Sequence, residues 1–232
     1  MSTVDFPGRN AAVVFLRGCP WRCHYCHNTH LQNRPGNALK GEPTDPNWEQ
    51  VEVFLESRRG LLDAVVFSGG EPLADKHLML RVQTVKAMGF EVGLHSAGAY
   101  PDRLETLLPR LDWVGLDIKA PFEDYASITT VSGSGQDARR SLERLLAGHT
   151  PFECRTTIHP SLLSQQAIRQ IGRQLAAMGV KHYALQHFRT LGCADLDLTR
   201  RLKTELGGEE YLPPELVNEL EGLFPQFEVR NA

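Results

Sequence analysis

The chain has 232 residues and a formal net charge of −3, with 41% apolar and 23% charged residues. This composition is typical of a globular protein; it excludes a disordered chain and gives no overall positive field for binding nucleic acid. The longest apolar run, Ala11–Leu16, has six residues. It is too short for a membrane-spanning helix or the core of a signal peptide, so we expect a cytoplasmic protein that does not bind membranes.

Short β-type runs alternate with helical patterns along most of the chain. Gly89 and Gly179 each follow a helical pattern, as residues that end helices commonly do. In chain order, strands are expected at residues 11–16, 64–68, 90–95, 113–119, 152–159 and 183–188. Helices are expected between them, at residues 48–59, 75–88, 101–108, 137–147 and 164–178.

This βαβ order predicts an α/β fold with a parallel sheet and helices outside it. Six strands favour an incomplete (β/α)6-type barrel, and a doubly wound open sheet is the alternative with the same local pattern. We expect one domain over residues 1–232, with the barrel at about 10–189 and an irregular C-terminal extension at about 190–232 that holds two short helices. Residues 32–47, rich in Asn, Pro and Gly, are expected to form a loop.

Polar residues occupy one face of two predicted strands. In 113–119, Gly115, Asp117 and Lys119 alternate with apolar residues, and in 152–159 Arg155 lies on the polar face. Because ligands bind at the carboxyl ends of parallel strands, these residues predict a polar cavity there. The alternative is that they face solvent on edge strands.

Three of the five cysteines, Cys19, Cys23 and Cys26, form a C-x3-C-x2-C motif directly after the first predicted strand. Three thiolates this close in sequence predict a metal centre. A zinc site completed by nearby histidines is one possibility, with His24, His27 and His30 as the candidates. A [4Fe–4S] cluster with three protein ligands is the other, and it would leave one iron open to a non-protein ligand.

The cysteine motif resembles that of the radical S-adenosylmethionine (SAM) superfamily, in which an aromatic residue, here Tyr25, precedes the last cysteine. A second element agrees with it: Gly69-Gly70-Glu71-Pro72 follows the second predicted strand and matches the superfamily's G-G-E-P element. The resemblance implies that these four residues hold the amino group of SAM. Glycines allow a ligand to approach the main chain closely, and a carboxylate can pair with an ammonium group.

The resemblance extends to the activases of glycyl radical enzymes, above all the activating protein of anaerobic ribonucleoside-triphosphate reductase. It rests on five further segments that together reach Arg189: residues 3–8, 26–28, 117–121, 155–160 and 185–189. Activases of pyruvate formate-lyase share several of these elements and are the alternative, as is a radical SAM enzyme acting on a small molecule or peptide. A zinc-stabilised module without catalytic activity is the remote alternative.

The resemblance implies roles for further residues. Asp117 and Lys119 match a D-x-K element near the SAM carboxylate and the substrate loop and are the candidate catalytic residues, and Arg155 matches an arginine associated with SAM. Ser96 and Gly98 stand where relatives have a T-N-G turn, and Ala97 replaces its asparagine. His95 stands where relatives have an aspartate that helps to bind a monovalent cation. Either a protonated His95 supplies positive charge there, or His95 is neutral, hydrogen-bonded and without contact to SAM.

The implied reaction is reductive cleavage of SAM, followed by removal of a hydrogen atom from a glycine of the partner enzyme. Its implied cofactors are a [4Fe–4S] cluster and SAM, and its implied electron donor is flavodoxin or ferredoxin. Cys154 and Cys193 are not expected to bind the cluster, because the first lies on an apolar strand face and the second has no cysteine near it in sequence. His182 and His187 are expected to pack or to line the cavity.

Overall fold

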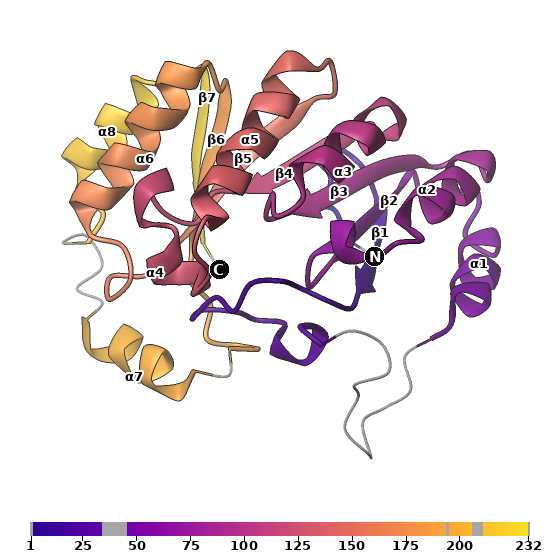
Figure 1. Cartoon of the computed structure of the whole chain (residues 1–232), viewed down its shortest axis with the longest axis horizontal. Helices are drawn as coiled ribbons and strands as arrows, with labels where there is room; N and C mark the ends of the chain where they lie inside the picture. Colours follow the sequence, from indigo (N-terminus) through magenta and orange to yellow (C-terminus); the bar gives the residue numbers. More distant parts are fainter. Residues whose placement is uncertain (1, 34–45, 194, 206–210, 232) are drawn as a thin grey trace.

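The computed structural model describes residues 2–33, 46–193, 195–205 and 211–231. Its central element is a parallel sheet in which the seven strands follow one another in chain order. Figure 1 shows the sheet curving from β1 round to β7. The strands are β1 (Ala11–Leu16), β2 (Ala64–Gly69), β3 (Glu91–Ser96), β4 (Trp113–Asp117), β5 (Phe152–Ile158), β6 (His182–His187) and β7 (Gln226–Arg230).

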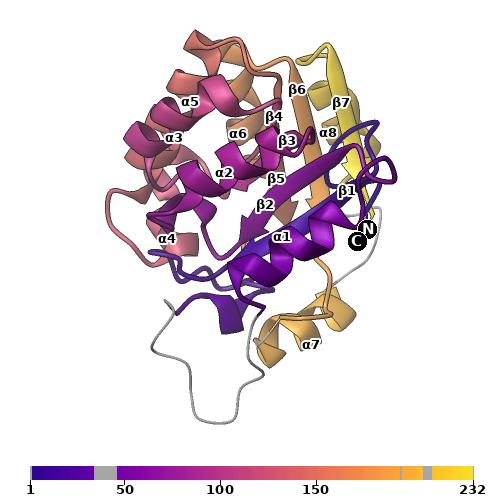
Figure 2. The ribbon, with the colours of Figure 1, turned by 90° about the vertical axis from the view of Figure 1, so that its right-hand side faces the viewer.

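Helices cover the convex face of the sheet, and two further helices lie beyond the carboxyl ends of the strands (Figures 1 and 2). The covering helices are α1 (Trp48–Glu56), α2 (Leu78–Ala87), α3 (Pro101–Leu107), α5 (Ser134–Ala147), α6 (Gln165–Met178) and α8 (Pro214–Glu221). Beyond the strand ends lie α4 (Ala126–Thr129) and α7 (Leu196–Glu205). No helix in the described part of the chain is long and apolar enough to cross a membrane.

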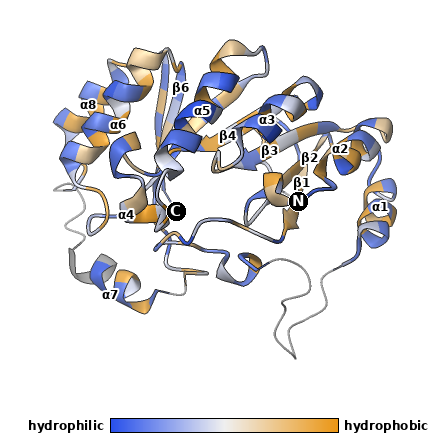
Figure 3. Cartoon of the chain, viewed as in Figure 1, coloured by the Kyte–Doolittle hydropathy of each residue, from blue (hydrophilic) through white to orange (hydrophobic). Residues whose placement is uncertain are grey.

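Local signals explain where the helices begin and end. The Ser164 hydroxyl accepts a hydrogen bond from the Ala167 N–H at the start of α6, and Gly179 ends that helix with a φ of +94°. At α1, Asn47 and Gln50 form a reciprocal capping box. Figure 3 shows the resulting pattern on α5 and α6, where hydrophilic and hydrophobic residues alternate around each helix.

The two faces of the sheet have different compositions. The convex face carries fully buried apolar side chains such as Val65, Leu94 and Leu116, which join the helices in the main core. The concave face holds a smaller apolar cluster in which Phe6, from the segment before β1, stacks on Trp113 with ring centroids 5.5 Å apart. This cluster closes the floor of the concave face and leaves its carboxyl end to polar residues.

The prediction of an incomplete barrel is confirmed, because β1 pairs only with β2 and β7 pairs only with β6 in the sheet. The expected strands and helices are all present, with ends that agree or are shifted by at most three residues. The predicted strand 113–119 ends earlier, at Asp117, because the Lys119 N–H bonds the Tyr125 hydroxyl at 3.0 Å instead of a neighbouring strand.

The C-terminal extension is more regular than the sequence indicated. It carries α7, α8 and a seventh strand, β7, which pairs with β6 from His182 to Gln186. β7 has only two apolar residues, Phe227 and Val229, which is a weak signal for a strand. Most of the predicted loop 32–47 lies outside the described residues, as does the Gly207-Gly208 pair.

Candidate functional site

A polar cavity of about 180 Å³ lies at the carboxyl ends of the strands, next to the loop that follows β1. Its lining brings together residues that lie far apart in the sequence. Of the predicted site residues, it includes Cys19, Cys23, Tyr25, Cys26, Gly69, Gly70, His95, Ser96, Asp117, Lys119 and Arg155. Glu71, Pro72 and Gly98 lie outside the lining of this cavity.

Main-chain hydrogen bonds hold the cysteine loop in place on two sides. On one side, the Gly18 N–H donates to the Leu31 carbonyl at 2.7 Å, and the Cys19 N–H donates to the Gln32 carbonyl at 3.0 Å. On the other side, the N–H groups of Arg22 and His24 donate to carbonyls of α4 at 3.0 and 3.2 Å. Trp21, between the first two cysteines, is 2% exposed and anchors the loop in the core.

The thiols suit a multi-iron cluster better than a single ion. In the described chain, only Glu153, His182 and Glu228 bring three ligand atoms within 4.8 Å of one another. At least two of the three thiols are therefore farther apart than the roughly 4 Å that a shared zinc ion at 2.3 Å from each sulfur would impose. A cubane cluster binds each thiolate through a different iron and accepts such a spacing.

Two other observations bear on the metal. His27, a candidate zinc ligand, instead uses its Nε2 in a 2.7 Å contact with the Arg189 carbonyl oxygen. Burial raises the pKa of the Cys19 thiol to about 12 and also raises the pKa of Cys23. Metal binding must therefore displace protons from these thiols, and it becomes more favourable as the pH rises.

The two glycines after β2 allow the chain to approach the cysteine loop closely. Gly69 has a φ of +123°, and a Cβ there would lie 2.3 Å from the Leu16 carbonyl oxygen. A Cβ on Gly70 would lie 2.6 Å from the Gly18 carbonyl oxygen. The Glu71 N–H then donates to that same Gly18 oxygen at 2.8 Å. The glycine turn thus carries exposed main chain into the cavity beside the thiols.

The Glu71 carboxylate lies next to the cavity and makes hydrogen bonds with three protein groups. It is fully buried and accepts hydrogen bonds from the Leu73 N–H at 3.1 Å, the Ala97 N–H at 2.8 Å and the Ser96 hydroxyl at 3.0 Å. Burial raises its pKa to about 7, although these hydrogen bonds oppose the shift. Glu71 therefore ties the end of β2 to the end of β3.

Charged side chains from β4 and β5 meet on the opposite wall. Arg155 donates from Nε and Nη2 to one oxygen of Asp117, at 3.0 and 2.8 Å. The Lys119 Nζ lies 3.7 Å from the other Asp117 oxygen and 5.5 Å from the centre of the Tyr25 ring. Burial alone would raise the pKa of Asp117, but the charges of Arg155 and Lys119 outweigh it and lower the pKa. The wall thus carries one ionised carboxylate between two cations.

His95 lies in the cavity, and its surroundings fit the neutral alternative. Its Nε2 lies 2.8 Å from the Asp5 carbonyl oxygen and 3.2 Å from Arg155 Nη1. Burial, with the neighbouring Arg155 charge, moves the pKa of His95 well below its usual range. The ring is therefore neutral near pH 7, and Arg155 supplies the positive charge at this position.

Several lining residues were not selected as site residues from the sequence. Asn28, two residues after the last cysteine, donates from its side-chain amide to the Gly69 carbonyl at 3.3 Å and so links the two motifs. Thr157 follows Arg155 on the same strand face, so alternation alone would have indicated it. Arg189 follows β6, as charged residues at strand ends of this fold often do. The others are Trp21, His27, Gln32, Ser68 and Ala97.

The segment after β6 also packs against the cysteine loop. A Cβ on Gly192 would lie 3.1 Å from the His27 carbonyl oxygen. Cys193 is half-buried, and its pKa is raised by burial and by negative charge at Asp195 and Cys26. Cys193 therefore lies in the electrostatic environment of the cysteine motif although it is far from it in sequence. Cys154 is fully buried in the main core, as expected.

Comparison with known proteins agrees with this geometry. Residues 13–161 match the Radical SAM superfamily. A Methanocaldococcus jannaschii protein named as a candidate glycyl-radical enzyme activating enzyme is 28% identical over 197 residues, which are 81% of this chain and 77% of that protein. The pyruvate formate-lyase-activating enzyme of Clostridium pasteurianum is 30% identical over 198 residues, which are 83% of this chain and 80% of the relative.

A solved structure gives the same fold. Streptococcus suis SuiB bound to S-adenosylmethionine aligns with a TM-score of 0.60 at 12% identity, over 98% of this chain and 51% of that chain. The present chain thus spans about half the length of SuiB, and the likeness concerns the fold alone.

The chain belongs to the radical SAM superfamily and, within it, to the branch of the glycyl-radical-enzyme activating enzymes. It is therefore a redox enzyme of a family that uses a [4Fe–4S] cluster and SAM, and not a zinc-stabilised binding module.

Proposed function

We propose that this enzyme cleaves SAM reductively and removes a hydrogen atom from one glycine of a partner enzyme, the anaerobic ribonucleoside-triphosphate reductase. The observation that carries the proposal is the shared cavity: three half-buried thiols and the Asp117–Arg155–Lys119 wall face the same polar space at the mouth of an open barrel. When bound, the cluster and SAM would supply the chemistry, which is one-electron reduction of the sulfonium and hydrogen-atom abstraction.

The chain's own residues would bind and orient these groups. Cys19, Cys23 and Cys26 would hold the cluster, and the main chain of Gly69 and Gly70 would approach the amino acid end of SAM. Arg155, held by two hydrogen bonds to Asp117, offers a fixed positive charge for a carboxylate. Lys119 is 8% exposed, so its ammonium group is largely shielded from water and interacts strongly with any anion in the cavity. Ser96, Gly98, Pro72 and Glu71 would maintain the shape of the cavity.

The choice of partner rests on the segments that resemble the ribonucleotide reductase branch. Arg155 and Thr157 of one segment line the cavity, and so does Arg189 of the segment 185–189. The C. pasteurianum relative favours pyruvate formate-lyase as the second candidate partner, since its name states that activity. Flavodoxin or ferredoxin is the proposed electron donor, because reduction of the cluster needs a low-potential protein.

Anaerobic activation assays test the proposal directly. The reconstituted protein, SAM and a chemical reductant are incubated with anaerobic ribonucleotide reductase or with pyruvate formate-lyase, each purified without its radical. We expect 5′-deoxyadenosine and a glycyl radical signal in electron paramagnetic resonance (EPR) spectra with the reductase. A signal with pyruvate formate-lyase alone would select the second partner. Reductive SAM cleavage without a radical on either protein would move the enzyme to a different substrate.

We further propose that residues 1–232 act as one radical SAM domain in the cytoplasm. The pairing of β7 with β6 supports a single unit. The five cysteines are all free, and free thiols that must hold a cluster favour a reducing compartment.

A further inference from the structure

The outer edge of β1 has free main-chain groups. The Leu16 carbonyl accepts a hydrogen bond from the Gly70 N–H at 2.9 Å, so the main-chain N–H and C=O groups of the even-numbered residues of β1 point toward β2. Ala11 faces the opposite side, where it exchanges two hydrogen bonds of 2.8 Å with Ser2. By alternation, the main-chain N–H and C=O groups of Val13 and Phe15 point to that same side. Within the described ranges, no hydrogen bond reaches their N–H or C=O groups.

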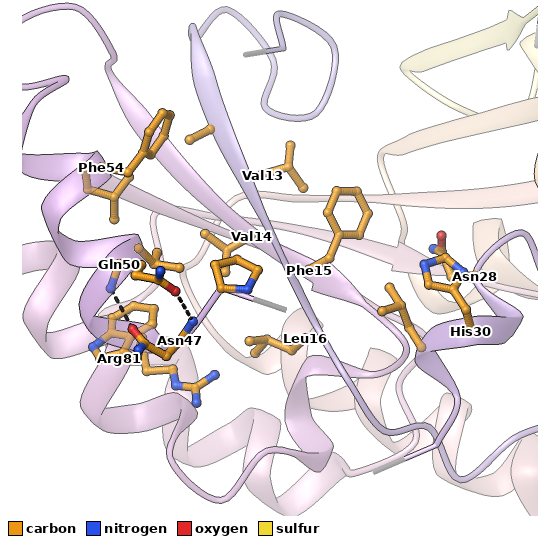
Figure 4. Close-up of a pocket in the computed structure, with 16 residues that line it drawn as sticks. Val13, Val14, Phe15, Leu16, Asn28, His30, Asn47, Gln50, Phe54 and Arg81 are labelled. Carbon is orange, nitrogen blue, oxygen red and sulfur yellow. Dashed lines mark hydrogen bonds between the residues drawn. The ribbon is translucent and has the colours of Figure 1, made fainter. Parts of the chain in front are cut away.

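A groove of about 880 Å³ runs along this edge, between β1 and helix α1 (Figure 4). Figure 4 shows Val13 and Phe15 on one side of the strand and residues of α1 on the other. Trp48, Val51 and Phe54 form the apolar wall on α1. Phe15 is 54% exposed and Phe54 is 42% exposed. Two large apolar side chains thus flank unpaired main-chain groups, a combination that favours pairing with another chain.

The groove leads to the thiol cavity. Asn28 lines both spaces, and it bonds the Gly69 carbonyl inside the cavity. β1 ends at Leu16, three residues before Cys19. A segment that runs along the edge of β1 in either direction therefore has one end beside the thiols.

We propose that the free edge of β1 and the groove between β1 and α1 bind an extended apolar segment of the glycyl radical enzyme as an added strand, which leads its glycine to the cavity. This proposal rests on the function proposed above. The cavity is only about 180 Å³ and would also hold the cluster and SAM. A folded domain therefore cannot enter, and only the tip of an extended segment can reach it. Val13 and Phe15 would supply main-chain hydrogen bonds, and the groove would take alternate side chains.

Amide hydrogen exchange measured by nuclear magnetic resonance tests the pairing. The probe is the glycyl radical enzyme that gives the EPR signal in the activation assay. In the free protein, the amides of Val13 and Phe15 should exchange fast. They should slow at least tenfold when the partner is added. The amides of Ala12 and Val14, which face β2, are the internal control and should be slow in both states.

Matched lysine variants test the groove. Phe15→Lys places a charge on the edge and blocks added strands, whereas Val53→Lys changes a 67% exposed residue of α1 outside the groove. We expect at least tenfold weaker partner binding and a matching loss of radical yield in Phe15→Lys alone. Both variants should cleave SAM at the normal rate without the partner, which separates this proposal from the proposed function.

Three results would overturn the proposal. Equal partner affinity in Phe15→Lys and the unaltered protein would show that the edge does not dock the partner. Slow exchange of Val13 and Phe15 in the free monomer would mean that the chain's own residues cover the edge. Slow exchange that appears only as protein concentration rises, with dimer formation in analytical ultracentrifugation, would assign the edge to a second copy.

Discussion

The thiols of Cys19, Cys23 and Cys26 lie together in the lining of the cavity. Replacing Cys19, Cys23 or Cys26 by Ala should each remove most of the iron and abolish SAM cleavage, because two thiolates cannot hold a cubane cluster securely. Cys154→Ala is the matched control, since this thiol is buried in the main core. Iron analysis and 5′-deoxyadenosine formation measure the outcome. Normal SAM cleavage by Cys23→Ala would contradict the assignment.

Cluster assembly should also depend on pH. Burial raises the pKa of Cys19 to about 12 and raises that of Cys23, so both thiols carry protons near pH 7 before metal binds. Binding releases these protons, and loading should therefore become more favourable as the pH rises. We expect more iron per chain after reconstitution at pH 8.5 than at pH 6.5, under equal iron, sulfide and reductant. Equal loading at both values would mean that the thiols are already ionised.

Glu71 gives a second pH effect, this time on stability. Its pKa is raised from 4.5 to about 7 by burial, so between these values the native state holds a proton that the unfolded chain has lost. The contribution of Glu71 to the free energy of unfolding therefore falls as the pH rises from 4.5 to about 7. The total loss is roughly 3 kcal/mol. Glu71→Gln should lose this slope, and urea unfolding of the reduced apoprotein at pH 5 to 8 measures it.

The control for that experiment is Glu143→Gln, which changes a carboxylate that is 50% exposed. Its stability should follow the unaltered protein at every pH. A constant difference between Glu71→Gln and the unaltered protein across the range would show that Glu71 is ionised throughout.

The glycine turn after β2 packs its main chain against Leu16 and Gly18, directly before the cysteine loop. Gly69→Ala should destabilise the fold by more than about 4 kcal/mol, because its Cβ would lie 2.3 Å from the Leu16 carbonyl oxygen in addition to the positive φ. Gly89→Ala isolates the backbone effect: its φ is +92° and its Cβ would meet nothing within 4 Å. The control should cost about 1–3 kcal/mol. Urea unfolding of both variants decides whether the close approach adds to the strain.

The elements best predicted from sequence are those whose apolar pattern is strong. β2 and β4 lie in continuous buried runs, and their starts at Ala64 and Trp113 agree with the structure. β7 was missed because its two apolar residues give little periodic signal and its place in the sheet depends on pairing with β6. Pairing between distant segments is a tertiary effect that local patterns do not encode.

The candidate site was also predicted in part from local sequence patterns. Spacing alone indicated the cysteines, and strand alternation indicated Asp117 and Arg155. The direction of the Glu71 carboxylate and the charge of His95 depend on burial and on neighbours brought in by other strands, such as Ser96 for Glu71 and Arg155 for His95. Sequence identifies which residues carry chemistry more readily than it identifies their protonation or orientation.

In the whole molecule, the carboxyl end of the curved sheet is polar and the concave face below it is partly apolar. The carboxyl end holds the thiols and the polar cavity, while the Phe6–Trp113 cluster fills part of the concave face below it. Farther round the sheet, Glu153 of β5 and Arg230 of β7 form a bidentate ion pair at 2.8 Å, and His182 lies near the same carboxylate. Because Glu153 is 1% exposed, this pair couples the last strand to the stability of the entire sheet.

Removing the arginine of that pair should be costly. Arg230→Met leaves the Glu153 carboxylate buried without its cation, and we expect a loss of about 3–5 kcal/mol in the free energy of unfolding. The matched control is Arg139→Met, which breaks an ion pair with Glu143 whose side chains are 59% and 50% exposed and should cost less than about 1 kcal/mol. Urea unfolding midpoints of the two variants measure the difference. If both variants unfolded at the same urea concentration, β7 would not depend on this pair for its place in the sheet.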